Sequence, residues 1–336
     1  MPNHLPGITF PSALAVTVGL LAGCGGSSQE REALPSPPPT DIRGDYHVDA
    51  RLANGVVTVV VPREGSRRVL DSRRHLETAW GFVIPPPSME GFVSREYLLS
   101  ENHSDGKTLV FANVEQNDSD PADYLVAGWW MHFPAGVERN DIANAERQVF
   151  FAGPELDAAR PPRLPTAGSA VYSGQAGGLY EYTYGADSTF ADQRGTTEFA
   201  EVYADARLNV DFSNGSIRGC IGCDGDVTAQ TYYLYPILPW RGDPPAALPK
   251  DYEITLESTV LESNGVFEEP NVIVSHPTRN IETYSGRWGG QLSNVPDSQN
   301  RPRRASGIAE VRFAESDGSE GKFDFGFGSL FPDSGG

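Results

Sequence analysis

The sequence has little positive charge and almost no lysine. Lysine and arginine together number 26 against 45 aspartates and glutamates, which gives a formal net charge of −19. Only three of the basic residues are lysine, namely Lys107, Lys250 and Lys322. A surface of this kind repels phosphate groups. The composition therefore argues against a nucleic-acid partner.

Residues in catalytic or metal-binding patterns are also scarce. The chain has three cysteines, and its six histidines are nowhere paired at the spacing of metal ligands. The patterns G-x-S-x-G and H-E-x-x-H are absent, and so is a glycine-rich phosphate loop. We therefore expect a protein that is not an enzyme and that needs no metal and no cofactor.

The chain lacks a convincing helical period, and no apolar run after its first 24 residues is long enough to cross a membrane. Glycine (36) and proline (27) are frequent among the 336 residues, which is typical of short strands joined by many turns. Hydrophobic residues make up 39% of the chain and aromatic residues 10%, enough to build a core. The composition favours an all-β fold, and the length suggests two domains.

Alternation of apolar and polar residues is clear after Thr166 and predicts antiparallel strands. Tyr180, Tyr182 and Tyr184 share one face of such a strand. Eight strands are predicted in this part: 168–174, 178–185, 203–213, 215–221, 251–260, 281–292, 305–313 and 321–331. Eight antiparallel strands with one apolar face suit a closed β-barrel whose interior is filled by side chains. A two-sheet sandwich is the alternative. We assign the barrel to residues 166–333.

The pattern before Pro165 is irregular but strand-like. Apolar and β-branched runs predict strands at 56–61, 107–112, 124–133 and 148–152. Residues 92–100 could hold a short turn, and residues 154–166, with four prolines, are expected to form a linker. We therefore expect a smaller, mainly β domain over residues 44–165, preceding the barrel.

The first 24 residues resemble the signal peptide of a bacterial lipoprotein. Residues 8–23 form an uncharged apolar stretch, shorter than the roughly 20 residues of a membrane-spanning helix. Leu21-Ala22-Gly23-Cys24 has the form of a lipobox, which predicts a signal peptide over 1–23 and a lipid on Cys24. Residues 24–43 are rich in Gly, Ser and Pro and form a tether. An ordinary secretory signal is the alternative, and either signal leads to an oxidising compartment.

Cys220 and Cys223 are the only cysteine pair once Cys24 carries a lipid. A structural zinc site needs four ligands, and no second pair is present. We expect a disulfide between Cys220 and Cys223 that closes a turn at a strand end. Two free thiols are the alternative.

The segment 118–123 contains three aspartates, as a calcium-binding loop would. An EF-hand loop needs glycine at its sixth position and glutamate at its twelfth, where this chain has Asp123 and Trp129. A solvated acidic loop is therefore the expected structure.

An aromatic segment, 231–240, lies between two predicted strands. Its prolines resist pairing in a sheet, and tyrosine and tryptophan are the residues that most often anchor protein interfaces. Tyr232, Tyr233, Tyr235 and Trp240 are therefore candidate partner-binding residues. The alternative is that these rings pack back onto the protein.

Three glycine-aromatic strands near the C-terminus resemble the closing strands of the transferrin-binding protein B β-barrel family. They are residues 286–292 (GRWGGQL), 307–313 (GIAEVRF) and 323–328 (FDFGFG). The resemblance implies a lipid-anchored outer-membrane or surface protein that binds a partner and catalyses nothing. True transferrin-binding lipoproteins carry two lobes, each a handle plus a barrel, whereas this chain has room for one. The resemblance therefore implies neither transferrin as partner nor any transferrin-contact residue.

These features together predict an outer-membrane lipoprotein of the bacterial cell envelope, facing the periplasm or the cell surface. It would contact the membrane through its lipid and act as a non-catalytic module that binds a protein or an iron-related ligand. The alternative is a structural or assembly component of the outer membrane with no small ligand.

Overall fold

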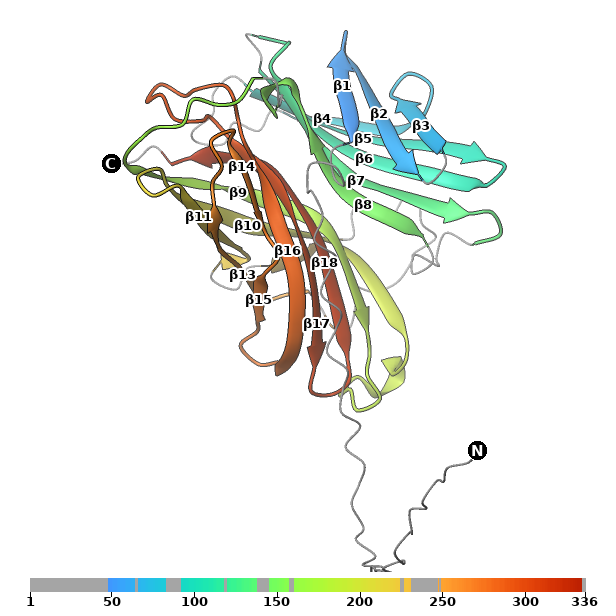
Figure 1. The fold of residues 1–336 in the computed structure, drawn as a ribbon. Helices are drawn as coiled ribbons and strands as arrows, with labels where there is room; N and C mark the ends of the chain where they lie inside the picture. The colour runs from blue at the N-terminus through green and yellow to red at the C-terminus, as the bar shows by residue number, and fades with distance from the viewer. Residues whose placement is uncertain are drawn as a thin grey trace, which may run out of the picture. The chain divides into compact units, whose positions relative to one another are not determined.

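The computed structural model describes residues 48–63, 66–82, 92–117, 120–137, 145–156, 160–223, 227–230, 247 and 249–333. All of them belong to one compact unit, Leu34–Gly336. The described chain is all-β and forms three antiparallel sheets (Figure 1). Over these residues, none of the helices has the length and apolar character that a membrane crossing requires.

The first sheet is small and consists of β1 (Asp49–Ala53), β2 (Val56–Arg63) and β3 (Ser66–Asp71), in that order. Asn54 and Gly55, between β1 and β2, both have positive φ angles, of 52° and 73°. A two-residue hairpin turn requires this backbone conformation, and asparagine followed by glycine favours it. Alternate residues of β2 are completely buried against the next sheet.

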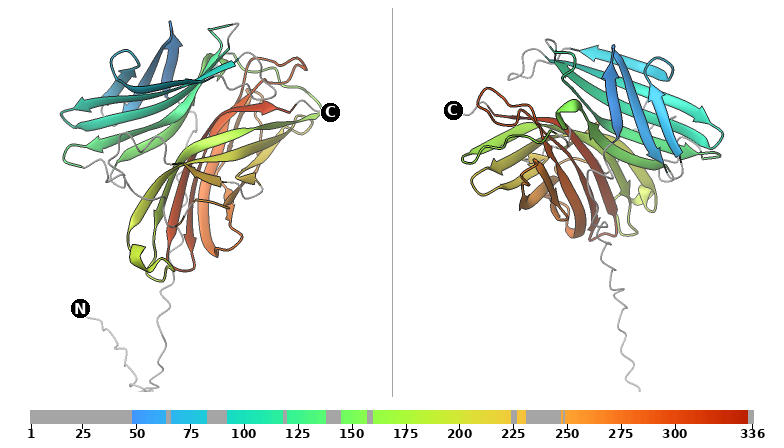
Figure 2. Two further views of the ribbon diagram at one scale, coloured as in Figure 1. Left: turned by 180° about the vertical axis from the view of Figure 1, so that it is seen from behind. Right: turned by 45° about the horizontal axis from the view of Figure 1, so that its top comes forward.

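The second sheet has five strands in sequential order. We call it the N-terminal sheet, to distinguish it from the large C-terminal sheet formed by β9–β18. They are β4 (Leu76–Phe82), β5 (Phe92–His103), β6 (Gly106–Asn117), β7 (Tyr124–Pro134) and β8 (Glu146–Ala152). Both of its faces are buried. Leu98, Phe111 and Trp129 contact the C-terminal sheet on one side. Their neighbours, including Leu99 and Val110, contact the first sheet on the other (Figure 2).

The prediction of a short turn at residues 92–100 is wrong, because these residues form most of β5. A strand that is buried on both faces carries apolar residues at successive positions, so the period-2 signal is lost. Leu98 and Leu99, both fully buried, are an example of such a pair.

The C-terminal sheet contains ten strands. They are β9 (Ser169–Thr183), β10 (Thr197–Asp211), β11 (Ser216–Ile221), β12 (Val227–Gln230), β13 (Glu253–Val260), β14 (Val266–Glu269), β15 (Val272–Ser275), β16 (Ile281–Leu292), β17 (Ala305–Glu315) and β18 (Glu320–Pro332). Nine follow the order β14-β16-β17-β18-β9-β10-β11-β13-β15, and β12 pairs with β10 beyond the end of β11. The strands curve around a common interior (Figures 1 and 2).

The strand count of this sheet differs from the eight expected. The predicted strands 168–174 and 178–185 are one strand, β9, whose pairing with β10 has no register shift. The short strands β12, β14 and β15 were not anticipated. Proline stands between β14 and β15, at Pro270, and the two strands have different ladder partners, β14 with β16 and β15 with β13. The segment 266–275 therefore contacts both β13 and β16.

The concave side of the C-terminal sheet is filled by its own side chains. The alternating residues predicted for this face, such as Leu208 and Val210, are at most 1% exposed. The rings of Phe323, Tyr180 and Tyr252 lie with their centroids 4.8 to 6.4 Å apart. These contacts make an aromatic core inside the sheet.

Candidate functional site

Most of the residues singled out in the sequence lie outside the part of the chain that the structure describes. Cys24 precedes the first described residue, and Tyr232, Tyr233, Tyr235 and Trp240 fall within the undescribed segment 231–246. The described flanks of that segment are β12, which pairs with β10, and Ala247, whose N–H donates to the hydroxyl of Tyr184 at 2.7 Å.

Cys220 and Cys223 are joined by a disulfide at the end of β11, with their Cα atoms 5.6 Å apart. Gly222 between them has a φ of +67°, and its N–H donates to the carbonyl of Asp205 on the neighbouring β10. The bond therefore closes a tight turn that is also held by the sheet.

We expect the same bond in the mature protein. Mass spectrometry of a peptide containing Cys220 and Cys223, prepared without reductant, should show the mass of two hydrogens fewer than the reduced peptide. An oxidising compartment and a short, closable loop are the physical reasons. Quantitative alkylation of both thiols without reductant would contradict the expectation.

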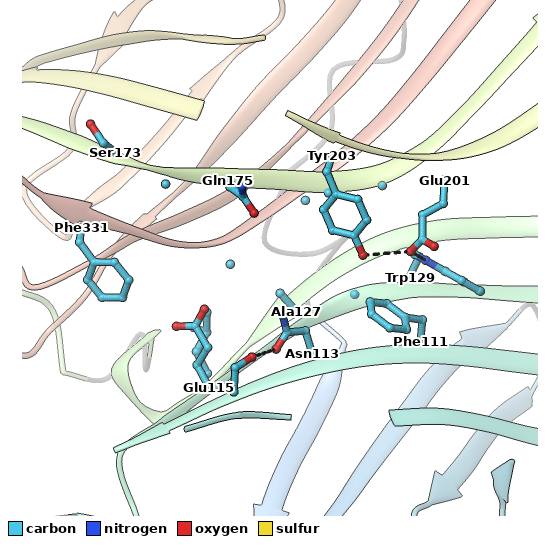
Figure 3. Close-up of a pocket in the computed structure, with 18 residues that line it drawn as sticks. Phe111, Asn113, Glu115, Ala127, Trp129, Ser173, Gln175, Glu201, Tyr203 and Phe331 are labelled. Atoms are coloured by element: carbon cyan, nitrogen blue, oxygen red, sulfur yellow. Dashed lines mark hydrogen bonds between the residues drawn. The ribbon is translucent and has the colours of Figure 1, made fainter. Parts of the chain in front are cut away.

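A cleft with a volume of about 410 Å³ lies between the N-terminal and C-terminal sheets (Figure 3). Strands β5, β6 and β7 form one wall, and strands β9, β10 and β18 form the other. Four aromatic side chains line it, those of Phe111, Trp129, Tyr203 and Phe331. Several lining residues are partly exposed, so solvent reaches the cleft.

Strand glycines shape the wall of the cleft formed by the C-terminal sheet. A Cβ atom on Gly177 would lie 2.9 Å from the ring of Tyr203, so this ring rests directly on the β9 backbone. A Cβ atom on Gly328 would lie 2.6 Å from the Cβ of Ala127 on β7. The glycines thus permit close approach of a ring at one point and of the facing sheet at another.

A register shift in β18 turns Phe331 toward the cleft. Phe323, Phe325 and Phe327 alternate into the interior, as their sequence spacing predicts. The pairing of β18 with β9 then shifts between Gly326 and Phe331. Leu330 therefore takes the interior position, and Phe331 lines the cleft. A bulge commonly re-aims a side chain in this way.

Glu201 is a buried carboxylate in the lining of the cleft. It is 1% exposed and accepts hydrogen bonds on Oε1 from the indole N–H of Trp129, at 3.2 Å, and the hydroxyl of Tyr203, at 3.3 Å. The bond to Trp129 joins β10 to β7, that is, the two sheets. These bonds also hold both rings in place against the cleft (Figure 3).

The wall on the N-terminal sheet carries a second set of polar groups. The Ser94 hydroxyl donates to Asn113 Oδ1 at 2.8 Å. Glu115 lies 3.5 Å from a guanidinium nitrogen of Arg304, and this guanidinium lies over the ring of Phe331, 5.4 Å from its centroid. Contacts within the protein therefore hold these polar groups of the wall in place.

A buried ionic cluster joins the sheets beside the cleft. Its centre is Glu155, which is 2% exposed and belongs to the short 3-10 helix η2 (Pro154–Leu156). Arg304 Nε lies 3.1 Å from Glu155 Oε1, Arg303 bridges Glu155 and Asp123, and the Ser293 hydroxyl donates to Glu155. The segment 154–166 was expected to be a linker and 118–123 a solvated loop. Both expectations are wrong for these two acids, because Glu155 and Asp123 are buried against arginine.

The environment separates the pKa values of the two acids. Burial and the hydrogen bond with Asp123 raise the pKa of Glu155 from 4.5 to about 7, against the effect of Arg304. Burial alone would raise the pKa of Asp123, but hydrogen bonds with Glu155 and other donors lower it from 3.8 to about 2. We therefore place the proton of the pair on Glu155 at neutral and lower pH.

Another buried network occupies the interior of the C-terminal sheet near one end of β17. Glu315 accepts hydrogen bonds from Tyr252 at 2.8 Å and Tyr182 at 3.0 Å, and Arg279 lies 3.3 Å from the same carboxylate. Burial raises the pKa of Tyr180 and Tyr252 well above 10. The aromatic groups of this network thus remain neutral and satisfy one another.

Metal ligands are not gathered anywhere in the described chain. Among those residues, no group of three or more His, Cys, Asp and Glu side chains is arranged to hold a metal ion. The cleft itself is partly open and is lined by aromatic rings and two carboxylates, those of Glu115 and Glu201.

Sequence reasoning missed this cleft because its lining comes from six strands spread between residues 94 and 331. The strand glycines were the one available sign of close packing at this place. Their spacing alone does not show which ring or strand packs against them.

Comparisons with known proteins add no assignment. No protein-family model matches the chain, and a search of curated proteins finds no significant match.

Proposed function

We propose that the chain is a lipid-anchored, non-catalytic binding module of the bacterial cell envelope, built as a single handle-plus-barrel unit. The handle would be the part before Pro165, and the barrel would be residues 166–333, as in the transferrin-binding protein B-like lipoproteins that the C-terminal strands resemble. The observation that carries the proposal is the filled interior of the C-terminal sheet. A partner then has to bind on the outside of the protein.

Two contacts support closure of the C-terminal sheet into a barrel. The segment 266–275 pairs with β16 through β14 and with β13 through β15. Leu261, just after β13, also forms an isolated bridge with Phe267 of β14. A sheet whose two end strands share one segment has no free edge there to aggregate. On this basis the principal barrel strands are eight, with 266–275 as the closing one.

The partner-binding residues in this proposal are Tyr232, Tyr233, Tyr235 and Trp240. The two flanks of their segment support this assignment. β12 pairs with β10, and the backbone of Ala247 forms hydrogen bonds with the hydroxyls of Tyr180 and Tyr184. The intervening stretch thus starts and ends on the barrel, and its aromatic residues offer a large apolar area at low entropic cost.

Truncation of these rings should weaken capture of a partner. The mature protein, used as bait with envelope extract or host fluid, should retain a protein, and Tyr233→Ala or Trp240→Ala should each cost about 2 kcal/mol or more of its binding free energy. Tyr284→Ala is the matched control, because Tyr284 is 45% exposed on β16 and lies outside the segment. Equal affinity of all four proteins would refute the assignment. Failure to capture any protein would favour the alternative, a structural component of the outer membrane.

Lipidation of Cys24 is testable by itself. Metabolic labelling with a fatty-acid analogue should mark the wild type and Cys223→Ser but not Cys24→Ser, because only Cys24 follows the lipobox. Label on Cys24→Ser, or its absence from the wild type, would rule out the lipid anchor and leave the ordinary secretory signal.

A further inference from the structure

We propose that the cleft between the N-terminal and C-terminal sheets binds a small molecule that combines a flat aromatic ring with a cationic amine. The inference rests on cleft residues other than the aromatic residues proposed above for partner binding, and it goes beyond the proposed function because it does not require a protein partner. It follows from the size of the cleft, the character of its walls and the sign of its charges.

The cleft has the dimensions and composition of a small-molecule site. Its volume of about 410 Å³ falls in the range of roughly 300–1,000 Å³ that is common for such sites. The side chains of Phe111, Trp129, Tyr203 and Phe331 present four aromatic rings from four different strands, β6, β7, β10 and β18. A ring-shaped ligand would gain stacking and edge contacts from these walls.

Among the residues that the structure describes, the charges that line the cleft are of one sign. Glu115 and Glu201 are the charged residues in this described lining, which holds no lysine, arginine or histidine. Glu115 is paired with Arg304, which stands behind the ring of Phe331. Glu201 is 1% exposed, and the two hydrogen bonds described above come to it from neutral groups, an indole and a phenol. Its carboxylate therefore favours a cation over an anion at this place.

The aromatic rings reinforce that preference. A cation over the face of tryptophan or tyrosine is attracted by the ring quadrupole, most strongly when both are shielded from water. Hydrogen bonds to Glu201 hold the rings of Trp129 and Tyr203 beside the carboxylate, so a single amine could contact the carboxylate and a ring face together. The net charge of −19 also attracts cations to the protein as a whole.

The test compares two probes that share one ring and differ in charge. We expect 1-naphthylmethylamine, a cation, to bind the full mature protein about tenfold more tightly than 1-naphthylacetate, an anion, since a shielded cation–π contact alone contributes about this factor. Ligand-observed NMR titration gives both affinities. Equal binding of the two probes, tighter binding of the anion, or no binding of either would overturn the proposal.

Glu201→Gln tests the carboxylate without changing its shape, because the amide oxygen can still accept from Trp129 and Tyr203. It should remove the preference for the amine, while the matched control Glu257→Gln, an exposed carboxylate on β13 outside the cleft, should keep it. If Glu201→Gln does not fold, Gln175→Trp provides the second test. Gln175 is exposed at the cleft, so a larger side chain there should block both probes. Binding unchanged in Gln175→Trp, or an unchanged preference in Glu201→Gln, would place the probes elsewhere.

Discussion

Arg304→Ala should lower the free energy of unfolding by about 3–5 kcal/mol, the cost typical of breaking a buried ion pair. The Arg304 side chain is completely buried, with its Nε 3.1 Å from Glu155 and another nitrogen 3.5 Å from Glu115. Its removal leaves the Glu155 carboxylate with less compensation in a site that water cannot reach. It also removes the guanidinium that covers the ring of Phe331.

Denaturant unfolding at about pH 8, where Glu155 is ionised, is the suitable measurement because the lost charge pair then has its largest effect. Arg218→Ala is the matched control, since Arg218 is exposed on β11, and an exposed substitution should change stability by no more than about 0.5 kcal/mol. Similar losses for the two variants would show that the cluster contributes little to holding the sheets together.

The C-terminal strands could be predicted because each of them has one polar and one apolar side. β10 is an example, in which the buried residues Leu208 and Val210 alternate with the exposed residues Arg207 and Asn209. Alternation of this kind survives in the sequence wherever one face of a sheet meets solvent. The same alternation did not reveal β14 and β15, because these strands have only four residues each and a proline lies between them.

The N-terminal sheet could not be predicted in the same way because it is the middle of three layers. Trp129 faces the C-terminal sheet and Trp130 faces the first sheet, and both are buried. Both faces carry large apolar side chains, so the strands read as irregular apolar runs. Which sheet packs on each face depends on tertiary contacts, and the local sequence pattern does not show them.

The candidate cleft and the ionic cluster depend on contacts between distant parts of the chain. Glu201 and Trp129 are 72 residues apart, and Arg303 and Asp123 are 180 apart. In the sequence, Glu201 is one of 45 acidic residues. The alternation of β18 alone would place Phe331 in the interior, because the sequence does not reveal the register shift in this strand. Residue type alone therefore identified neither of them.

Glu155 should make the stability of the protein depend on pH. Its folded-state pKa, about 7, lies above its usual value of 4.5, chiefly because burial disfavours the carboxylate. A group whose pKa rises on folding contributes stability that is fully present below the unfolded pKa and is lost as the pH rises through the folded pKa. Asp123 has the opposite shift, to about 2, so it stays ionised throughout this range and does not obscure the effect.

Glu155→Gln removes this dependence, because glutamine cannot ionise but can still donate a hydrogen bond to Asp123. The unfolding free energy of the wild type, relative to that of Glu155→Gln, should fall by about 3 kcal/mol between about pH 4 and pH 8, since each pKa unit corresponds to roughly 1.4 kcal/mol. Denaturant titrations of both proteins across this range measure the difference, and the other carboxyl groups cancel from it. Glu257→Gln, which removes an exposed carboxyl on β13, should show no comparable change. A difference between wild type and Glu155→Gln that is constant or rises with pH would mean that Arg303 and Arg304 keep Glu155 ionised in the folded protein.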